Sequence, residues 1–305
     1  MKAPLVFSPE VVLARAEGRA VVALESTIIT HGMPRPANLE TARAVEADIR
    51  AAGATPATIA VMDGHIHIGL TDDALAALAE NPDVRKLSRA DLAVCLAEGA
   101  TGATTVAATM IAARLARIEV FATGGIGGVH RGAETTFDIS ADLRELAHTP
   151  VTVVASGAKA ILDLPKTFET LETLGVPVIA FGQDALPAFW SRDAGLAAPL
   201  RLDDPALIAA AHRMRGWLGL AGGQLVANPI PEEAEIPASK IAPHIGSALE
   251  MAAEAGIAAK EVTPFLLDLI GERTRGAALA ANIALVRSNA RLAARIASEL
   301  ARLAE

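Results

Sequence analysis

Short apolar runs rich in β-branched residues alternate with amphipathic stretches of helical length as far as Gln183. The apolar runs predict strands over residues 20–24, 118–122, 151–155 and 176–181. Residues 39–52 carry apolar side chains at helical spacing, and Asn38 stands in the N-cap position before them. Alternation of this kind predicts an α/β fold of three layers, α/β/α, with helices on both sides of a mixed central sheet.

Turn and cap residues set further element boundaries. Asp63 and Gly64 predict a two-residue hairpin between strands at 58–62 and 65–70. Thr71 is expected to cap a helix over residues 72–80, and Ser88 another that ends near Gly99. A further helical stretch is expected to begin near Gly157.

Beyond Gln183 the pattern is mostly helical, with one short strand expected at residues 224–227. Helices are predicted over residues 205–218, 238–255, 263–272 and 277–303. No internal repeat or long linker divides the chain. We therefore expect a single domain over residues 1–305.

Composition narrows the class of protein. Hydrophobic residues make up 52% of the chain, which is enough for a sizeable core. A net charge of −8 argues against binding of a nucleic acid polymer, whereas a single nucleotide needs only a local cationic pocket. Cys95 is the only cysteine, so no intramolecular disulfide can form. No signal-type segment and no apolar run of about 20 residues is present, which predicts a cytoplasmic protein without a membrane partner.

A glycine-rich stretch follows the predicted strand at 118–122. Residues 123–132 contain five glycines, and such a stretch either cradles an anion through its backbone N–H groups or makes a tight turn between packed elements. His130 stands where a dinucleotide-binding loop needs glycine or alanine, and no Gly-Lys-Ser/Thr ending marks a P-loop.

Lys159 follows the strand at 151–155 after the small residues Ser156, Gly157 and Ala158. Most lysines are solvated surface groups. At a strand end beside a helix start, partial burial and the helix dipole would lower the pKa of the ammonium group, which would make the amine a nucleophile towards carbonyl-like carbon. Lys166 is the competing candidate.

Two carboxylates are candidates for chemistry. Glu25 ends the first predicted strand among hydroxyl residues and His31, which suits proton transfer as well as local pairing. Asp138 lies in residues 135–139, before the next predicted helix begins, and a carboxylate with hydroxyl and water neighbours suits Mg²⁺ or Mn²⁺. Ser140 and Asp142 by contrast have a structural explanation at the start of a helix over residues 141–146.

Two further polar residues have less distinctive surroundings. Lys86 lies in a basic segment that could meet a phosphate or simply be solvated. Asn282 lies in an apolar stretch and would need hydrogen-bond partners for its amide if buried.

Together these segments resemble the pseudouridine-5′-phosphate glycosidase family, which includes proteins related to indigoidine synthase A. The departures from the family pattern are small: Arg35 stands where an aromatic is common and Trp190 where phenylalanine is usual. The matching stretches span nearly the whole chain in the family's order, at residues 23–34, 102–110, 121–143, 156–163, 228–232 and 280–286.

The resemblance implies an indigoidine synthase A-like fold, a homotrimer and one Mn²⁺-type ion per subunit. It implies that Glu25 is the proton donor, Lys159 the covalent nucleophile and Asp138 the metal-linked aspartate. It also implies that Asn282 is an active-site residue. The substrate-binding positions that it implies are Lys86, Val106, Ser140, Ala141 and Asp142.

The implied reaction is reversible cleavage of pseudouridine 5′-phosphate to uracil and ribose 5-phosphate, by an enzyme of the lyase class. Uracil is joined to ribose through carbon, so its expulsion needs ring opening and a lysine imine as an electron sink. Another imine-forming sugar-phosphate lyase or aldolase would share Lys159 but release no uracil. A protein that only binds a ligand would show binding without conversion.

Overall fold

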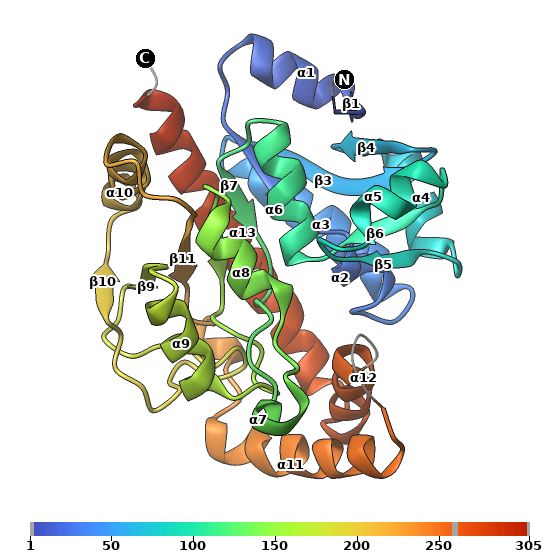
Figure 1. Ribbon diagram of the computed structural model, residues 1–305, viewed down its shortest axis with the longest axis vertical. Helices are drawn as coiled ribbons and strands as arrows, with labels where there is room; N and C mark the ends of the chain where they lie inside the picture. The colour runs from blue at the N-terminus through green and yellow to red at the C-terminus, as the bar shows by residue number, and fades with distance from the viewer. Residues whose placement is uncertain (1–2, 258–261, 304–305) are drawn as a thin grey trace.

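The computed structural model describes residues 3–257 and 262–303 (Figure 1). Its strands are β1 (Leu5–Phe7), β2 (Val21–Leu24), β3 (Thr55–Met62), β4 (His65–Ile68), β5 (Arg85–Leu87), β6 (Gly102–Thr104), β7 (Val120–Ala122), β8 (Thr152–Ala155), β9 (Val178–Phe181), β10 (Leu200–Leu202) and β11 (Gln224–Ala227).

Its helices, including one 3₁₀ turn, are α1 (Pro9–Ala16), α2 (Thr27–Thr30), α3 (Ala37–Ala51), α4 (Asp72–Glu80), α5 (Leu92–Ala97), α6 (Val106–Leu115), α7 (Ala133–Thr136), α8 (Ala141–His148), α9 (Leu164–Thr173), α10 (Pro205–Trp217), η1 (Glu232–Ala234), α11 (Ala238–Glu254), α12 (Val262–Arg273) and α13 (Ala277–Arg302). None of these helices is long and apolar enough to cross a membrane.

The strands form one mixed sheet in the order β1-β4-β3-β2-β7-β8-β11-β9-β10, with β6 and β5 branching from β3. Neighbouring strands from β3 to β10 run parallel. The hairpin at Asp63 and Gly64 makes β3 and β4 antiparallel, as the sequence predicts. Because β2, β7 and β8 are adjacent and parallel, their carboxyl ends meet at one edge of the sheet.

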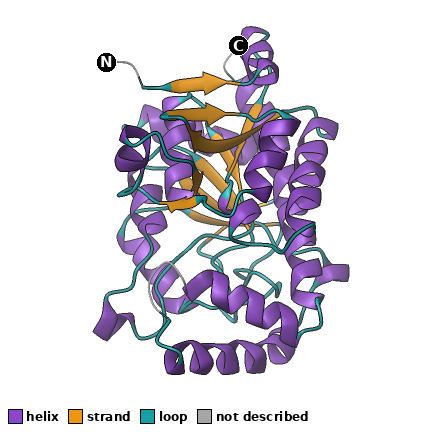
Figure 2. Ribbon diagram, turned by 90° about the vertical axis from the view of Figure 1, so that its right-hand side faces the viewer, coloured by secondary structure: helices purple, strands orange, loops and turns teal. Residues whose placement is uncertain are grey.

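Helices cover both faces of the sheet, which confirms the three-layer prediction (Figures 1 and 2). On one face α6, α8 and α9 pack side by side. On the other, α13 crosses β2, β7 and β8 between α3 and α10. Ala290, Ala293 and Ala294 of α13 are fully buried, and such small side chains allow the helix to lie close to its neighbours.

Two predicted caps are wrong. Helix α3 begins at Ala37, and the Asn38 side chain instead donates to the carbonyl oxygens of Ile29 (2.9 Å) and Ala79 (3.2 Å). Helix α5 begins only at Leu92, so Ser88 lies outside it. The cap of α4 by Thr71 is confirmed.

The predicted helix start near Gly157 is also wrong. Residues 156–163 form a loop, and α9 begins at Leu164 with the Asp163 side chain accepting from the Lys166 amide. The single domain predicted over residues 1–305 stays a prediction, and residues 1–2, 258–261 and 304–305 lie outside the described part of the chain.

Candidate active site

A cavity of about 330 Å³ opens at the carboxyl edge of β2, β7 and β8, a volume typical of small-ligand sites. Helix α12 adds Thr263, Pro264 and Leu267 to its wall. All nine predicted site residues line this one cavity: Glu25, Lys86, Val106, Asp138, Ser140, Ala141, Asp142, Lys159 and Asn282.

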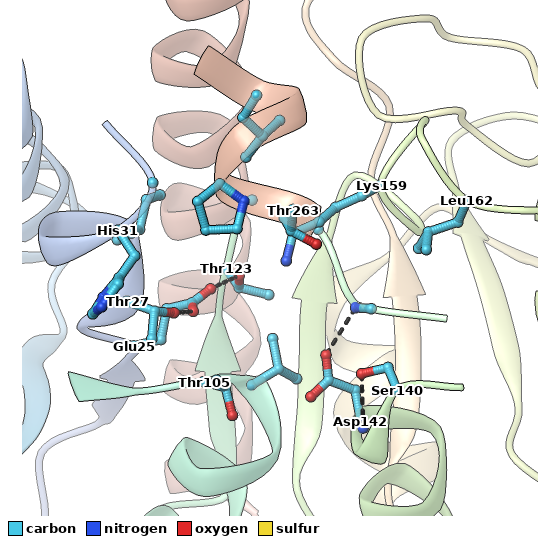
Figure 3. A pocket seen from close by; sticks show the side chains of 18 of the residues that line it. Glu25, Thr27, His31, Thr105, Thr123, Ser140, Asp142, Lys159, Leu162 and Thr263 are labelled. Carbon is cyan, nitrogen blue, oxygen red and sulfur yellow. Dashed lines mark hydrogen bonds between the residues drawn. The ribbon is translucent and has the colours of Figure 1, made fainter. Parts of the chain in front are cut away.

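Glu25 follows β2 directly and is 7% exposed. The preceding Leu24 pairs with Ala122 at the end of β7, which brings Glu25 beside Thr123. The hydroxyls of Thr27 and Thr123 each donate to one carboxylate oxygen of Glu25 (Figure 3). Two hydroxyl donors therefore orient a nearly buried carboxyl group on the cavity wall.

Lys159 is half-buried on the loop that leaves β8. Its backbone N–H donates to the Ile126 carbonyl oxygen at 3.1 Å, so the lysine loop lies against the glycine-rich loop. Gly157 has a φ of +76°, and a Cβ there would lie 2.6 Å from the Pro187 carbonyl oxygen, so glycine is required. Because α9 begins five residues later, the expected helix-dipole effect on Lys159 lacks its structural basis.

The competitor Lys166 does not line the cavity. Its ammonium group pairs with Asp163 at 2.9 Å and Glu134 at 3.1 Å, and these hydrogen bonds raise its pKa. A protonated, solvated amine is a poor nucleophile, so the geometry favours Lys159.

The glycine-rich stretch is explained largely by packing. Gly127 donates its N–H to the Asp142 carboxylate at 2.8 Å, and a Cβ on Gly125 would lie 2.7 Å from the Phe189 ring. A Cβ on Gly128 would lie 2.6 Å from the Thr167 methyl group. The stretch is thus a turn between tightly packed elements, while Gly124, Gly125 and Gly127 also face the cavity.

Two helices begin at the cavity. Ser140 caps α8 by accepting from the Asp142 amide at 3.2 Å, and Thr105 caps α6. The buried Asp142 carboxylate accepts from the Ala107 amide at 2.9 Å as well as from Gly127, so it fixes the start of α6. Val106, in the first turn of α6, is buried. Two helix N-termini beside one cavity favour an anionic ligand there.

Asp138 is the exposed carboxylate of the cavity, with a side chain that is 37% exposed. The His130 backbone N–H donates to the Asp138 carbonyl oxygen at 3.0 Å, and His130 Nδ1 lies 3.9 Å from an Asp138 carboxylate oxygen. Burial lowers the pKa of His130; the Asp138 charge opposes this shift, and the positive charges of Lys159 and Lys86 reinforce it. Among the described residues, no three His, Cys, Asp or Glu side chains gather to hold an ion by themselves.

Lys86 and Asn282 complete the predicted set. The half-buried Lys86 on β5 lies near His31, whose pKa is lowered by burial and by the Lys86 charge. The buried Asn282 has the partner that its burial demands, because the Trp190 indole donates to Asn282 Oδ1 at 2.6 Å. This hydrogen bond occupies Asn282 Oδ1 and fixes the orientation of the side-chain amide.

Several lining residues were not predicted. Thr123 follows β7 and Thr105 follows β6. Only the order of these strands in the sheet brings the two hydroxyls to the cavity. Phe189 and the α12 residues come from segments without a motif. No local signal in the sequence marks such wall residues.

The family model described as indigoidine synthase A like protein matches residues 10–299. The chain belongs to this family. It is 71% identical over 300 residues to pseudouridine-5′-phosphate glycosidase of Jannaschia sp. (strain CCS1), covering 98% of this chain and 99% of that protein. The corresponding protein of Paracoccus denitrificans (strain Pd 1222) is 70% identical over 301 residues, with the same coverage.

Two solved structures agree with the fold. The prealnumycin C-glycosynthase AlnA, in complex with ribulose 5-phosphate, has a TM-score of 0.90 at 39% identity, with 98% of each chain covered. An indigoidine synthase A-like protein of Thermotoga maritima also has a TM-score of 0.90, at 35% identity, covering 98% of this chain and 97% of that one.

Proposed function

We propose that the chain is a pseudouridine-5′-phosphate glycosidase, which reversibly cleaves the C–C glycosidic bond of pseudouridine 5′-phosphate to uracil and ribose 5-phosphate. The observation that carries the proposal is the convergence of Glu25 and Lys159 on one cavity from strand ends that flank β7. Relatives of 70% and 71% identity that bear this name support it.

Glu25 begins the reaction as the proton donor. It gives its proton to the ribose ring oxygen as the bond from that oxygen to C1′ breaks, and uracil supplies the electrons that open the sugar. The Lys159 amine then adds to C1′ and the uracil ring regains its electrons.

The Lys159 nitrogen next acts as the electron sink. After uracil C5 takes up a proton, the nitrogen lone pair forms an iminium with C1′ while the C1′–C5 bond breaks and uracil leaves. Water adds to C1′, releasing ribose 5-phosphate and the free lysine amine. The sum consumes one water per substrate.

The phosphate of the substrate would bind at the helix starts. The N-termini of α6 and α8 favour negative charge, and Lys86 adds a cation on the same cavity wall. Val106, Ser140, Ala141 and Asp142 belong to these first turns. Asp142 would act by fixing the backbone there, since both of its carboxylate oxygens already accept amide N–H groups.

Within the cavity, the surroundings of Asp138 suit an ion of the Mn²⁺ type. The described residues offer no cage made entirely of protein ligands, whereas Asp138 alone, completed by water and substrate oxygens, matches how such ions bind phosphorylated substrates. Bound there, the ion would supply positive charge beside the substrate. Removal of divalent ions by a chelator should lower turnover, and added Mn²⁺ should restore it in the wild-type protein but not in Asp138→Asn.

We also propose a homotrimer in the cytoplasm. Trp217 and Leu218 at the end of α10 are 79% and 72% exposed, and apolar surface of this kind suits burial against another copy of the chain. The single cysteine, Cys95, is buried and free, which fits a reducing compartment.

A different imine-forming sugar-phosphate lyase or aldolase is the second candidate, because Lys159 and the anion-favouring helix starts would serve it equally. The test is to incubate the purified protein with pseudouridine 5′-phosphate and to follow both products by chromatography. Release of uracil and ribose 5-phosphate in equal amounts supports the proposal. Turnover of other phosphorylated sugars without any uracil release from pseudouridine 5′-phosphate would favour the alternative.

A further inference from the structure

A fully buried amide on α13 joins the strand ends that form the cavity. Asn289 Nδ2 donates to the Thr123 carbonyl oxygen at 2.8 Å and to Ser156 Oγ at 3.2 Å. Its Oδ1 accepts from Asn228 Nδ2 at 2.9 Å. These partners are the first residues after β7, β8 and β11, three adjacent strands of the sheet. Asn289 itself does not line the cavity.

Two of the three partners lead directly to the reacting groups. The Thr123 hydroxyl donates to the Glu25 carboxylate, and Ser156 begins the loop that carries Lys159. One amide nitrogen therefore holds, through two hydrogen bonds, the residue that orients the proton donor and the loop that presents the amine.

The chemistry of this position requires an amide. The Thr123 carbonyl oxygen needs a donor, and the Asn228 side chain needs an acceptor, so the residue between them must offer both. An apolar residue would remove the donor to the Thr123 carbonyl oxygen and leave Asn228 Nδ2, among the described residues, with only the Ser288 hydroxyl at 3.2 Å, and an ionised carboxylate would oppose the Thr123 carbonyl oxygen. Fully satisfied buried networks of this kind rigidify the groups that they join.

We infer that Asn289 is a positioning residue of the proposed reaction: it holds Thr123 against Ser156 and thereby sets Glu25 at its working distance from Lys159. The inference rests on the proposed function. Its effect should fall on the chemical step, because Asn289 makes no contact with the cavity where substrate would bind.

The test compares two buried amides at opposite ends of the same strands. Gln224 is also 0% exposed, and its Nε2 donates to Thr152 Oγ1 at 3.2 Å and to the Ile208 carbonyl oxygen at 3.0 Å, at the start of β8 and β11. Asn289→Asp and Gln224→Glu make the same chemical change at two fully buried amides that each donate through nitrogen, although Gln224 Oε1 has no hydrogen-bond partner in the described part of the chain and Asn289 Oδ1 accepts from Asn228. For each variant kcat, KM and the thermal unfolding midpoint are measured with pseudouridine 5′-phosphate as substrate.

We expect Asn289→Asp to lose about 100-fold in kcat, with KM changed by less than about threefold. Gln224→Glu should keep kcat within about threefold of wild type, even if its unfolding midpoint falls by as much as that of Asn289→Asp. Because a protonated carboxyl can still donate to the Thr123 carbonyl oxygen, the kcat of Asn289→Asp relative to wild type should rise as the pH falls. If Asn289→Asp does not fold, Ser156→Ala removes one link of the network and should lower kcat without raising KM.

Unchanged kcat in the folded position-289 variant, or equal kcat losses in both amide variants, would overturn the inference while leaving the proposed function in place. If Asn289→Asp does not fold, unchanged kcat in Ser156→Ala has the same meaning. Absence of uracil release by the wild-type protein would overturn both.

Discussion

Glu25 owes its place to two neighbours that act at different ranges. Thr27 is two residues away in the chain, whereas Thr123 is brought to it by the pairing of β2 with β7. The sequence around Glu25 predicts a polar strand end, whereas the Thr123 hydroxyl reaches Glu25 only because β2 and β7 are neighbours in the sheet. The carboxyl is therefore both shielded from water and oriented.

Glu25→Gln keeps the shape of the side chain but removes the proton. We expect kcat for uracil release to fall by about 10²–10⁴-fold with little loss of stability. Glu46→Gln is the control, because Glu46 is also 7% exposed and accepts from the Thr58 hydroxyl, yet lies outside the cavity, where its other oxygen accepts from Arg50 at 3.1 Å. Full activity of Glu25→Gln would exclude Glu25 as the proton donor.

The lowered pKa of His31 predicts how stability depends on pH. Burial and the Lys86 charge disfavour the protonated ring in the folded protein, so the unfolded chain takes up a proton more readily as the pH falls through about 6.5. The stability that this neutral ring contributes is present above that pH and is lost below it. His31→Gln lacks this dependence.

Urea unfolding without substrate measures the effect. Between about pH 8 and about pH 5.5, wild type should lose more of its free energy of unfolding than His31→Gln does. Equal losses in the two proteins would show that His31 titrates alike in the folded and unfolded states.

At the scale of elements, the sequence predicts the long helices and the central strands but not the short edge strands. β7, β8, β9 and β11 lie within their predicted ranges because their apolar runs are buried on both faces. β1, β5 and β10 have three residues each and are half-exposed; β5 and β10 contain charged residues, and the apolar run of β1 is too short to predict a strand. The loop at residues 156–163 was mistaken for helix because small residues favour either structure.

The packing of the glycine-rich stretch against α8 can be tested by substitution. A Cβ on Gly127 would lie 2.8 Å from Asp142 Oδ2, so Gly127→Ala must displace the start of α8. We expect a loss of about 1–3 kcal/mol in the free energy of unfolding, together with weaker substrate binding. Gly216→Ala is the control: that glycine lies exposed within α10 with nothing near its Cβ, and alanine there should stabilise by about 1 kcal/mol.

Chemical unfolding and a substrate titration on both glycine variants check this pair. If Gly127→Ala unfolded at the wild-type denaturant concentration, the close packing of the glycine-rich loop against α8 would be wrong.

At the scale of the whole molecule, the site is a property of the parallel sheet. The nine predicted residues come from segments as distant as Glu25 and Asn282, and they meet because the polypeptide enters each central strand from the same side. The family resemblance predicts all nine residues, whereas the residue pattern alone favours Glu25, Asp138 and Lys159 and leaves Lys86 and Lys166 as open candidates. The wall from α12 and the buried link through Asn289 depend on tertiary packing that no local pattern encodes.

The proposed homotrimer is a prediction about the whole molecule as well. Light scattering on the chromatographed protein should return the mass of three chains at micromolar concentration. A single-chain mass under conditions of full activity would contradict it.

Borohydride trapping tests the central claim most directly. The protein is mixed with pseudouridine 5′-phosphate and borohydride, digested, and mapped by mass spectrometry, with Lys159→Ala and Lys166→Arg treated alongside. We predict a reduced pentose-phosphate adduct on Lys159 in wild type and in Lys166→Arg, and neither adduct nor turnover in folded Lys159→Ala. An adduct on another lysine, or none while uracil is released, would contradict the imine mechanism.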